Sequence, residues 1–235
     1  MFSGSTVLLT GVGAEGQVGE VVAQAFANLG AAVALVDRTA ASVEARAADI
    51  VARGHDARGY ACDLTNADAV ATLVQRVRAD YGESLHALVH MAGGFAMSGP
   101  VADSSVDVWN HQIAINLTTA FLATRAFIPM LRAGRGAIVL FASEAAMPGS
   151  TNAERSAYAV AKTGVVTLMR SIAAEERKNG VRANAVAPIA IRTAANVSAM
   201  GENARYIERE QVAAAVTFLC SPDASAMTGN VIPLS

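Results

Sequence analysis

Tyr158 and Lys162 lie four residues apart in the stretch SAYAVAKTG, and their types and spacing could support proton transfer. If the stretch is helical, both side chains project from one face. A phenol with an ordinary pKa of about 10 is a poor base near neutral pH, but the ammonium group of Lys162 would lower that pKa. Tyr158 could then remove a proton from a hydroxyl group or donate one to a carbonyl group. Taken alone, the same pair also fits an ordinary surface helix.

The stretch TGVGAEGQVG, residues 10–19, is rich in glycine and precedes a helical pattern. Gly11, Gly13 and Gly16 match the Gly-x-Gly-x-x-Gly dinucleotide fingerprint literally, with Gly16 opening the helix. We favour Gly11, Gly16 and Gly19, because Gly11 ends a strand and Gly19 begins the apolar stripe of the helix, where close packing needs a missing side chain. In either register, free backbone N–H groups at the helix start attract a pyrophosphate, and Glu15 should point away from it.

Asp37 ends the second apolar run, about 20 residues after the glycine loop. A carboxylate at this place accepts hydrogen bonds from the adenosine ribose hydroxyls and repels a 2'-phosphate, which favours NAD over NADP. Arg38 leaves NADP possible, because its guanidinium could bind a 2'-phosphate or stack on the adenine. Asp37 could also be only a helix cap.

Strands and helices must alternate to position these residues, and the sequence contains that alternation. Short, nearly continuous apolar runs, as expected for strands buried on both faces of a parallel sheet, are separated by longer segments of helical period. The predicted strands are 5–10, 31–37, 57–63, 85–91, 136–143, 181–187 and 230–235, and the predicted helices are 18–29, 40–53, 66–81, 105–132, 155–178 and 209–220. The pattern predicts an α/β fold: a single Rossmann-like, doubly wound domain over residues 1–235, with about seven parallel strands and helices on both faces.

The motifs form an ordered set along almost the whole chain. The set comprises TGVGAEGQVG, Asp37, CDL at 62–64, MAGG at 91–94, Asn116 in AINLTTAF, Ser143 after IVLFA, the Tyr158 and Lys162 pair, and NAVAPIAIRT at 184–193. Together these motifs resemble the short-chain dehydrogenase/reductase (SDR) family of classical type. The resemblance implies an NAD-dependent enzyme that interconverts an alcohol and a carbonyl by hydride transfer, with Tyr158 as general acid/base.

The resemblance also implies roles for the individual site residues. Ser143 would orient the reacting oxygen toward Tyr158. Asn116 would hold a water in a proton relay to Lys162, which would also bind the nicotinamide ribose. A positively charged nicotinamide ring would further lower the pKa of Tyr158. The implied cofactor-binding set, with Asp63 and Leu64 at the adenine and Thr193 at the carboxamide, is Gly11, Gly16, Gln17, Val18, Gly19, Asp37, Arg38, Asp63, Leu64, Ala92, Gly93, Tyr158, Lys162, Pro188, Ile191 and Thr193.

Several positions depart from the family pattern. The glycine loop is longer than the usual Thr-Gly-x-x-x-Gly-x-Gly. His90 replaces the first residue of the usual Asn-Asn-Ala-Gly, and Ile189 replaces the glycine after Pro188. Residues 194–208 form a short substrate loop, so the pocket is expected to be open or closed by a partner subunit. Enoyl-carrier-protein reductases share an enlarged glycine loop, but they separate Tyr and Lys by more than four residues, so that activity is set aside.

Three further functions remain as alternatives. The strings AGGFAMSG and TGNVIPL resemble dihydropteridine reductase-like members, which act on a flat heterocycle, and a 3-oxoacyl-carrier-protein reductase-like activity is a related possibility. A non-catalytic dinucleotide-binding sensor or assembly protein is the alternative from another class. A sensor needs no proton relay, so the intact Asn116, Ser143, Tyr158 and Lys162 set argues against it.

Composition limits the partners. The net charge of -2 gives no basic field for nucleic acid or an anionic membrane. Only Cys62 and Cys220 are present, which fits a cytoplasmic protein, and the four histidines show no metal-ligand spacing, so no metal is expected. Small, discrete ligands are therefore the better expectation, and the family resemblance implies that the substrate is a small-molecule alcohol or carbonyl. By the family resemblance, the long helices suggest a homo-oligomer, either a tetramer or a dimer.

Overall fold

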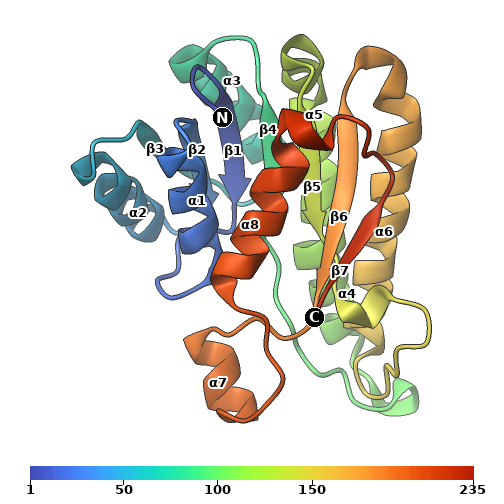
Figure 1. Ribbon diagram of the computed structural model, residues 1–235. Coiled ribbons are helices and arrows are strands. Elements are labelled where there is room, and N and C mark those ends of the chain that lie inside the picture. The colour runs from blue at the N-terminus through green and yellow to red at the C-terminus, as the bar shows by residue number, and fades with distance from the viewer.

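The computed structural model describes residues 1–235, and its central element is one sheet of seven parallel strands. The strands are β1 (Thr6–Thr10), β2 (Ala32–Asp37), β3 (Ala57–Ala61), β4 (Ala87–His90), β5 (Ala137–Phe141), β6 (Arg182–Pro188) and β7 (Val231–Leu234). Their spatial order is β3-β2-β1-β4-β5-β6-β7 (Figure 1). The chain therefore winds outward from β1 to one edge and restarts at β4 in the opposite direction. This order confirms the predicted doubly wound, Rossmann-like sheet.

Helices cover both faces of the sheet. They are α1 (Val18–Asn28), α2 (Ala40–Ala52), α3 (Ala67–Tyr81), α4 (Val106–Ile113), α5 (Thr119–Gly134), α6 (Ser156–Glu176), α7 (Ala194–Met200) and α8 (Arg209–Cys220). Helices α1, α2 and α8 pack on one face, and α3, α5 and α6 pack on the other (Figure 1).

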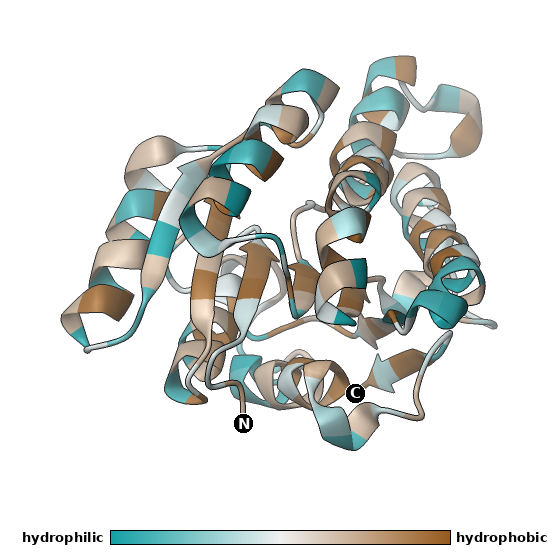
Figure 2. Cartoon of the chain, turned by 90° about the horizontal axis from the view of Figure 1, so that it is seen from above, coloured by the Kyte–Doolittle hydropathy of each residue, from teal (hydrophilic) through white to brown (hydrophobic).

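Each face of the sheet has its own apolar core. In β1, Val7 and Leu9 belong to the core beneath α1 and α8, whereas Leu8 belongs to the core beneath α5 and α6. Successive strand residues point to opposite faces, so a strand between two helical layers must be apolar at every position. Figure 2 shows the largely hydrophobic strands between the two layers of helices. This burial explains the continuous apolar runs in the sequence.

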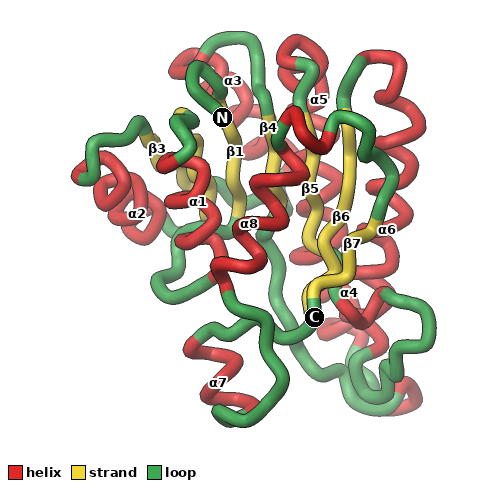
Figure 3. The backbone as a smooth tube through the Cα atoms, in the orientation of Figure 1, coloured by secondary structure: helices red, strands yellow, loops and turns green.

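Two predicted segments differ from the structure. The helix predicted over 105–132 is interrupted by one π-helical turn, Ala114–Thr118, between α4 and α5. The segment 194–208, predicted as a loop, contains the short helix α7, which lies beside the carboxyl edge of the sheet (Figure 3). The hydroxyl of Thr193 caps α7 by accepting a hydrogen bond from the N–H of Asn196 at 3.2 Å.

By length and composition alone, one helical stretch, Val106–Gly134, could cross a membrane, and its mean hydropathy is 1.3. In this fold the stretch forms part of a helical layer. Phe127, Met130 and Leu131 of α5 are buried in the core between this helix and the sheet. Burial against the strands accounts for its apolar character.

Candidate active site

An elongated trough runs along the carboxyl edge of the sheet, next to the point between β1 and β4 where the strand order reverses. It consists of two clefts, one of about 420 Å³ containing Asp37 and one of about 350 Å³ containing Tyr158. Both clefts are lined by Val18, Met91 and Gly93, so they adjoin. Ligands of doubly wound sheets bind at this kind of switch point.

The glycine loop packs tightly between β1 and α1. A Cβ atom on Gly19 would lie 2.8 Å from the Cα of Val12, and one on Gly11 would lie 2.7 Å from the backbone nitrogen of Ala92. Gly16 has open space around it but a φ of +71°, which favours glycine. Packing or backbone conformation thus accounts for each glycine of the favoured register. Glu15 is exposed to solvent.

Gly13 has a role that the favoured register omitted. Its backbone N–H donates to Oδ2 of Asp37 at 2.9 Å, and a Cβ on Gly13 would lie 2.7 Å from Cγ of the same carboxylate. Oδ1 of Asp37 accepts the N–H of Arg38 at 2.8 Å. With a longer bond from the N–H of Thr39, three backbone donors orient the carboxylate, and only glycine fits against it. The literal Gly-x-Gly-x-x-Gly match was the signal that could have identified Gly13.

The first cleft, at the Asp37 end of the trough, brings together residues from four strand ends. Asp63 accepts hydrogen bonds from the backbone and hydroxyl of Thr65 at 2.9 and 2.6 Å, and these bonds, with a smaller effect of the Arg38 charge, lower the pKa of its carboxyl group. The predicted residues that line this cleft are Gly11, Gln17, Val18, Asp37, Arg38, Asp63, Leu64, Ala92 and Gly93. Sequence reasoning missed Ala14, Thr65, His111 and Ile115, which also line it. Ala14 and Ile115 lie within the motifs TGVGAEGQVG and AINLTTAF but were given no role of their own, and no motif marked Thr65 or His111.

Tyr158 and Lys162 lie on α6, and both line the second cleft with Ser143, which follows β5. The Nζ of Lys162 donates to the carbonyl oxygen of Phe141 at 2.8 Å, and burial lowers the pKa of Lys162 to about 8. The same nitrogen is 5.8 Å from the centre of the Tyr158 ring. The ring of Phe95 packs on the ring of Tyr158 edge to face, with 5.1 Å between the centroids.

The pKa of Tyr158 differs from the sequence prediction. Burial raises it, whereas a hydrogen bond with the side chain of Ser143 and the positive charge of Arg155 act in the lowering direction. The prediction that Lys162 lowers the pKa of this phenol is therefore wrong for the structure as described. Desolvation of the phenolate is the larger effect, and the opposing charge comes from Arg155.

Asn116 lies in the π-helical turn and is buried. Its side chain accepts the N–H of Gly94 at 3.1 Å and donates to the carbonyl oxygens of Gly94 and Gln112 at 2.9 and 3.1 Å. A Cβ on Gly93 would lie 2.5 Å from Oδ1 of Asn116 and 3.5 Å from Nζ of Lys162. Asn116 and Lys162 therefore both approach the side of Gly93 that lacks a side chain. Such π turns occur frequently at functional sites.

His90 occupies the end of β4, where the sequence departs from the family pattern. The ring is buried between two threonines: Nδ1 lies 3.0 Å from Oγ1 of Thr10, and Nε2 lies 3.1 Å from Oγ1 of Thr119. The Thr10 hydroxyl also accepts the N–H of Ala92 at 3.3 Å. His90 thus connects the core, through Thr10, to residues 91–93, which line the clefts.

The wall of the second cleft is formed after β6. Pro188, Ile189 and Ile191 line it, whereas Thr193 is buried and its hydroxyl caps α7. Met200 also lines this cleft, and sequence reasoning missed further lining residues, namely Phe95, Glu144, Arg155 and Asn196. Two of these had a signal in the sequence: Phe95 lies in the string AGGFAMSG, and Arg155 lies three residues before Tyr158.

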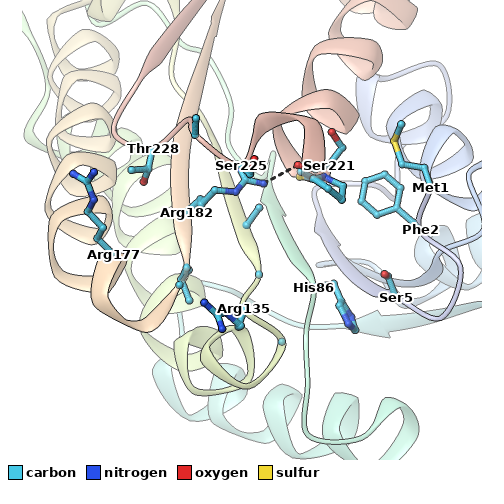
Figure 4. A pocket seen from close by; sticks show the side chains of 18 residues that line it. Met1, Phe2, Ser5, His86, Arg135, Arg177, Arg182, Ser221, Ser225 and Thr228 are labelled. Carbon is cyan, nitrogen blue, oxygen red and sulfur yellow. Dashed lines mark hydrogen bonds between the residues drawn. The ribbon is translucent and has the colours of Figure 1, made fainter.

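A different cleft, of about 540 Å³, contains Phe2, His86 and Arg182 and lies near the amino-terminal ends of the strands (Figure 4). The guanidinium of Arg182 donates to the carbonyl oxygens of Leu219 and Ser221 at 2.8 and 3.0 Å, and thereby binds the carboxyl end of α8. No predicted site residue lines this cleft. The contacts of Arg182 are those of a structural cap.

Comparisons with known proteins identify the family. Residues 11–235 match the family model described as Enoyl-(Acyl carrier protein) reductase. The chain is 35% identical over 236 residues to a D-threitol dehydrogenase of Mycolicibacterium smegmatis, covering 95% of this chain and 88% of that protein. It is also 35% identical over 236 residues to a cis-4-hydroxycyclohexanecarboxylate dehydrogenase of Sinomonas cyclohexanicum, covering 94% and 91% of the two chains.

The fold comparison agrees. The crystal structure of an NAD+-bound xylitol dehydrogenase superimposes with a TM-score of 0.90 at 27% identity, covering 99% of this chain and 98% of that one. The relatives and the ordered motifs confirm the resemblance seen in the sequence and the expected enzyme class. The chain is an oxidoreductase and belongs to the short-chain dehydrogenase/reductase family.

Proposed function

We propose that this enzyme is an NAD-dependent oxidoreductase that interconverts an alcohol and a carbonyl, with Tyr158 as general acid/base. The observation that carries the proposal is the trough itself. A carboxylate acceptor, Asp37, lies in one of its two adjoining clefts, and the Ser143, Tyr158 and Lys162 group lies in the other. This arrangement suits a dinucleotide whose adenosine and nicotinamide ends have different binding requirements.

The residues of the first cleft fit the adenosine half of the cofactor. The Asp37 carboxylate, oriented by Gly13 and Arg38, can accept the ribose hydroxyls and would repel a 2'-phosphate. Arg38 is exposed, and its charge acts on Asp63. These contacts support NAD over NADP. When bound, the nicotinamide ring supplies the hydride acceptor or donor.

The second cleft supplies proton transfer and orientation. Tyr158, as the phenolate, would take the proton of the substrate hydroxyl during oxidation and return it to the carbonyl oxygen during reduction. Ser143 would donate a hydrogen bond to the same oxygen, and Lys162 would bind the nicotinamide ribose. The approach of both Asn116 and Lys162 to the open side of Gly93 supports a proton relay through a water held between them.

The substrate is a small alcohol or ketone. The names of the relatives include polyols and a hydroxy acid. A dihydropteridine reductase-like or 3-oxoacyl-carrier-protein reductase-like activity is the second candidate, because of the strings noted in the sequence. The sensor alternative is not retained, since the chain belongs to a family of oxidoreductases.

We also propose that residues 1–235 act as one domain and assemble as a homo-oligomer, a tetramer or a dimer. The side chains of Trp109 on α4, Phe121 on α5 and Val160 on α6 are 40, 47 and 47% exposed, and these helices lie on one side of the sheet. Apolar surface of this kind favours association of subunits. Light scattering that gives a strict monomer would contradict the assembly proposal.

The proposed function is tested by two linked measurements on the purified protein. NADH and NADPH are titrated separately, with nicotinamide fluorescence as the signal. NAD+ is then supplied with a panel of secondary alcohols, polyols and hydroxy acids, and NADH formation is followed. We expect tighter binding of NADH, loss of that preference in Asp37→Ser, and turnover of at least one alcohol. Tighter binding of NADPH to the unmodified protein would contradict the cofactor choice, and turnover of quinonoid pterins alone would favour the second candidate.

A further inference from the structure

We propose that Arg155 binds an anionic group of the substrate, so that the enzyme acts on alcohols or ketones that carry a carboxylate or phosphate. The proposal rests on the proposed function, because it concerns the substrate of the same cleft. Arg155 lines that cleft together with Ser143 and Tyr158. It immediately precedes α6 and lies three residues before Tyr158, about one helical turn away.

Most N–H donors of the Arg155 guanidinium have no partner in the protein. Its only hydrogen bond goes from Nη2 to the carbonyl oxygen of Thr151 at 2.7 Å. Arg155 takes part in none of the ion pairs of the chain, although Glu144 lines the same cleft. A guanidinium carries five N–H donors in a planar fork that matches a carboxylate or phosphate. Most of these donors therefore remain for a ligand.

The backbone on both sides of Arg155 is held in place. Glu154 has a φ of 59°, an uncommon left-handed conformation for a residue other than glycine. Its carbonyl oxygen accepts the N–H groups of Ser98 and Gly99 at 2.7 and 3.0 Å. The hydroxyl of Ser98 also lies 3.3 Å from that of Ser156. Strained backbone that the surroundings enforce is found preferentially at functional sites, and here it fixes the residue that enters the cleft.

Arg155 is close enough to the reacting end to affect it. Its charge acts to lower the pKa of the Tyr158 phenol, so the two side chains share one electrostatic environment. The other cation of the cleft, Lys162, is buried and bound to the carbonyl oxygen of Phe141. Apolar surface from Phe95 and Met200 also lines the cleft. A fitting ligand has a hydroxyl at Tyr158, an apolar body and an anionic end at Arg155.

The test compares acids with their neutral counterparts. The probes are lactate, 3-hydroxybutyrate and cis-4-hydroxycyclohexanecarboxylate, each beside its methyl ester, and glycerol 3-phosphate beside glycerol. The proteins are the unmodified enzyme, Arg155→Gln, Arg155→Lys and the control Arg170→Gln, which changes an exposed arginine of the same helix. Each is assayed for kcat and KM with NAD+, and each is titrated with NADH.

We expect the unmodified enzyme to favour the best acid over its ester by about tenfold or more in kcat/KM, as a charge-assisted hydrogen bond would give. Arg155→Gln should remove this preference mainly by raising KM for the acid, and Arg155→Lys should restore part of it. Any effect on the Tyr158 pKa is shared by acid and ester, so it cancels in their ratio. Arg170→Gln should match the unmodified enzyme, and NADH affinity should not change in any variant.

Equal use of acids and esters by the unmodified enzyme, or an unchanged acid-to-ester ratio in Arg155→Gln, would overturn the role of Arg155. A preference for glycerol 3-phosphate alone would identify the anion as phosphate. If no alcohol is oxidised at all, the proposed function fails, and the role of Arg155 is then tested separately by calorimetric titration of the enzyme with the same acids. If the acids do not bind, or bind Arg155→Gln equally well, the proposed role of Arg155 is overturned.

Discussion

The carboxylate of Glu20 accepts a hydrogen bond from the backbone N–H of Gly16 at 2.7 Å, across the first turn of α1. Its charge is balanced by Arg46 and Arg209, whose Nη1 atoms lie 3.3 and 3.8 Å from the carboxylate oxygens. A carboxylate thus binds the backbone of the glycine loop, but it is Glu20 of α1 rather than the exposed Glu15. Glu20 fixes the conformation of the loop from the side of α2 and α8.

This contact predicts that Glu20→Ala weakens NADH binding. Loss of one charge-assisted hydrogen bond at the loop should raise the dissociation constant about fivefold, and Glu20→Gln should recover part of the affinity. Fluorescence titration of NADH measures the effect, with Glu15→Ala as the matched control. Tighter binding by Glu20→Ala would mean that its negative charge near the phosphates outweighs its support of the loop.

His90 is predicted to stay neutral at every pH at which the enzyme is folded and active. Burial and the charge of Lys162 lower the pKa of its imidazole to about 3. Because the hydroxyl of Thr119 donates to the carbonyl oxygen of Ile115 at 2.8 Å, it must accept from His90, which places the ring proton on Nε2. Nitrogen NMR of labelled histidine should therefore show an Nε2–H ring that does not titrate between about pH 5 and 8. A titration midpoint in that range would contradict the assignment.

Glu176 is predicted to stabilise the fold in a pH-dependent way. It is buried, and it accepts two hydrogen bonds from Arg132 at 2.8 and 2.7 Å, which, with Asn179, lower its pKa below the ordinary 4.5. Because the pKa of this carboxyl group is lower in the folded state than in the unfolded state, Glu176 stabilises the fold at any pH above its unfolded-state pKa. This contribution disappears as the pH falls through its folded-state pKa. Glu176→Gln should therefore lower the free energy of unfolding at neutral pH, but by less than the loss of a fully buried ion pair, because Arg132 is half exposed and water screens its charge.

Urea denaturation of Glu176→Gln at neutral and acidic pH checks this prediction. The difference in free energy of unfolding between Glu176→Gln and the unmodified protein should shrink as the pH falls. The neighbouring Glu175→Gln, at an exposed position, should change the free energy of unfolding little. A difference that persists undiminished in acid would show that packing, and not the charge, is responsible.

The sheet and much of the site could be predicted from the sequence. Strands such as Thr6–Thr10 are buried on both faces, so their apolar runs identify a parallel sheet. Parallel strands bring their carboxyl ends to one edge, and Asp37 at the end of β2 and Ser143 just after β5 lie at that edge. The family resemblance supplied the roles of Asn116 and Lys162, and those roles remain predictions.

Other features depend on contacts between distant segments. The apolar period runs through 105–132, so the π turn that carries Asn116 gave no signal; its hydrogen bonds go to the loop at Gly94. The entry of Arg155 into the cleft depends on the left-handed turn at Glu154, which Ser98 holds from far along the chain. The pKa of Tyr158 is a balance of burial against nearby charges, and the spacing of Tyr158 and Lys162 alone could not give its direction.

The most direct test of the account is the kinetics of Tyr158→Phe with the best alcohol from the panel. Removal of the phenol hydroxyl eliminates proton transfer but leaves the ring that packs on Phe95. We predict that kcat falls by roughly a hundredfold to ten-thousandfold, while the NADH dissociation constant stays within a few-fold of the unmodified enzyme. Turnover at the normal rate in Tyr158→Phe, with cofactor binding intact, would remove Tyr158 from the chemistry and contradict the proposed mechanism.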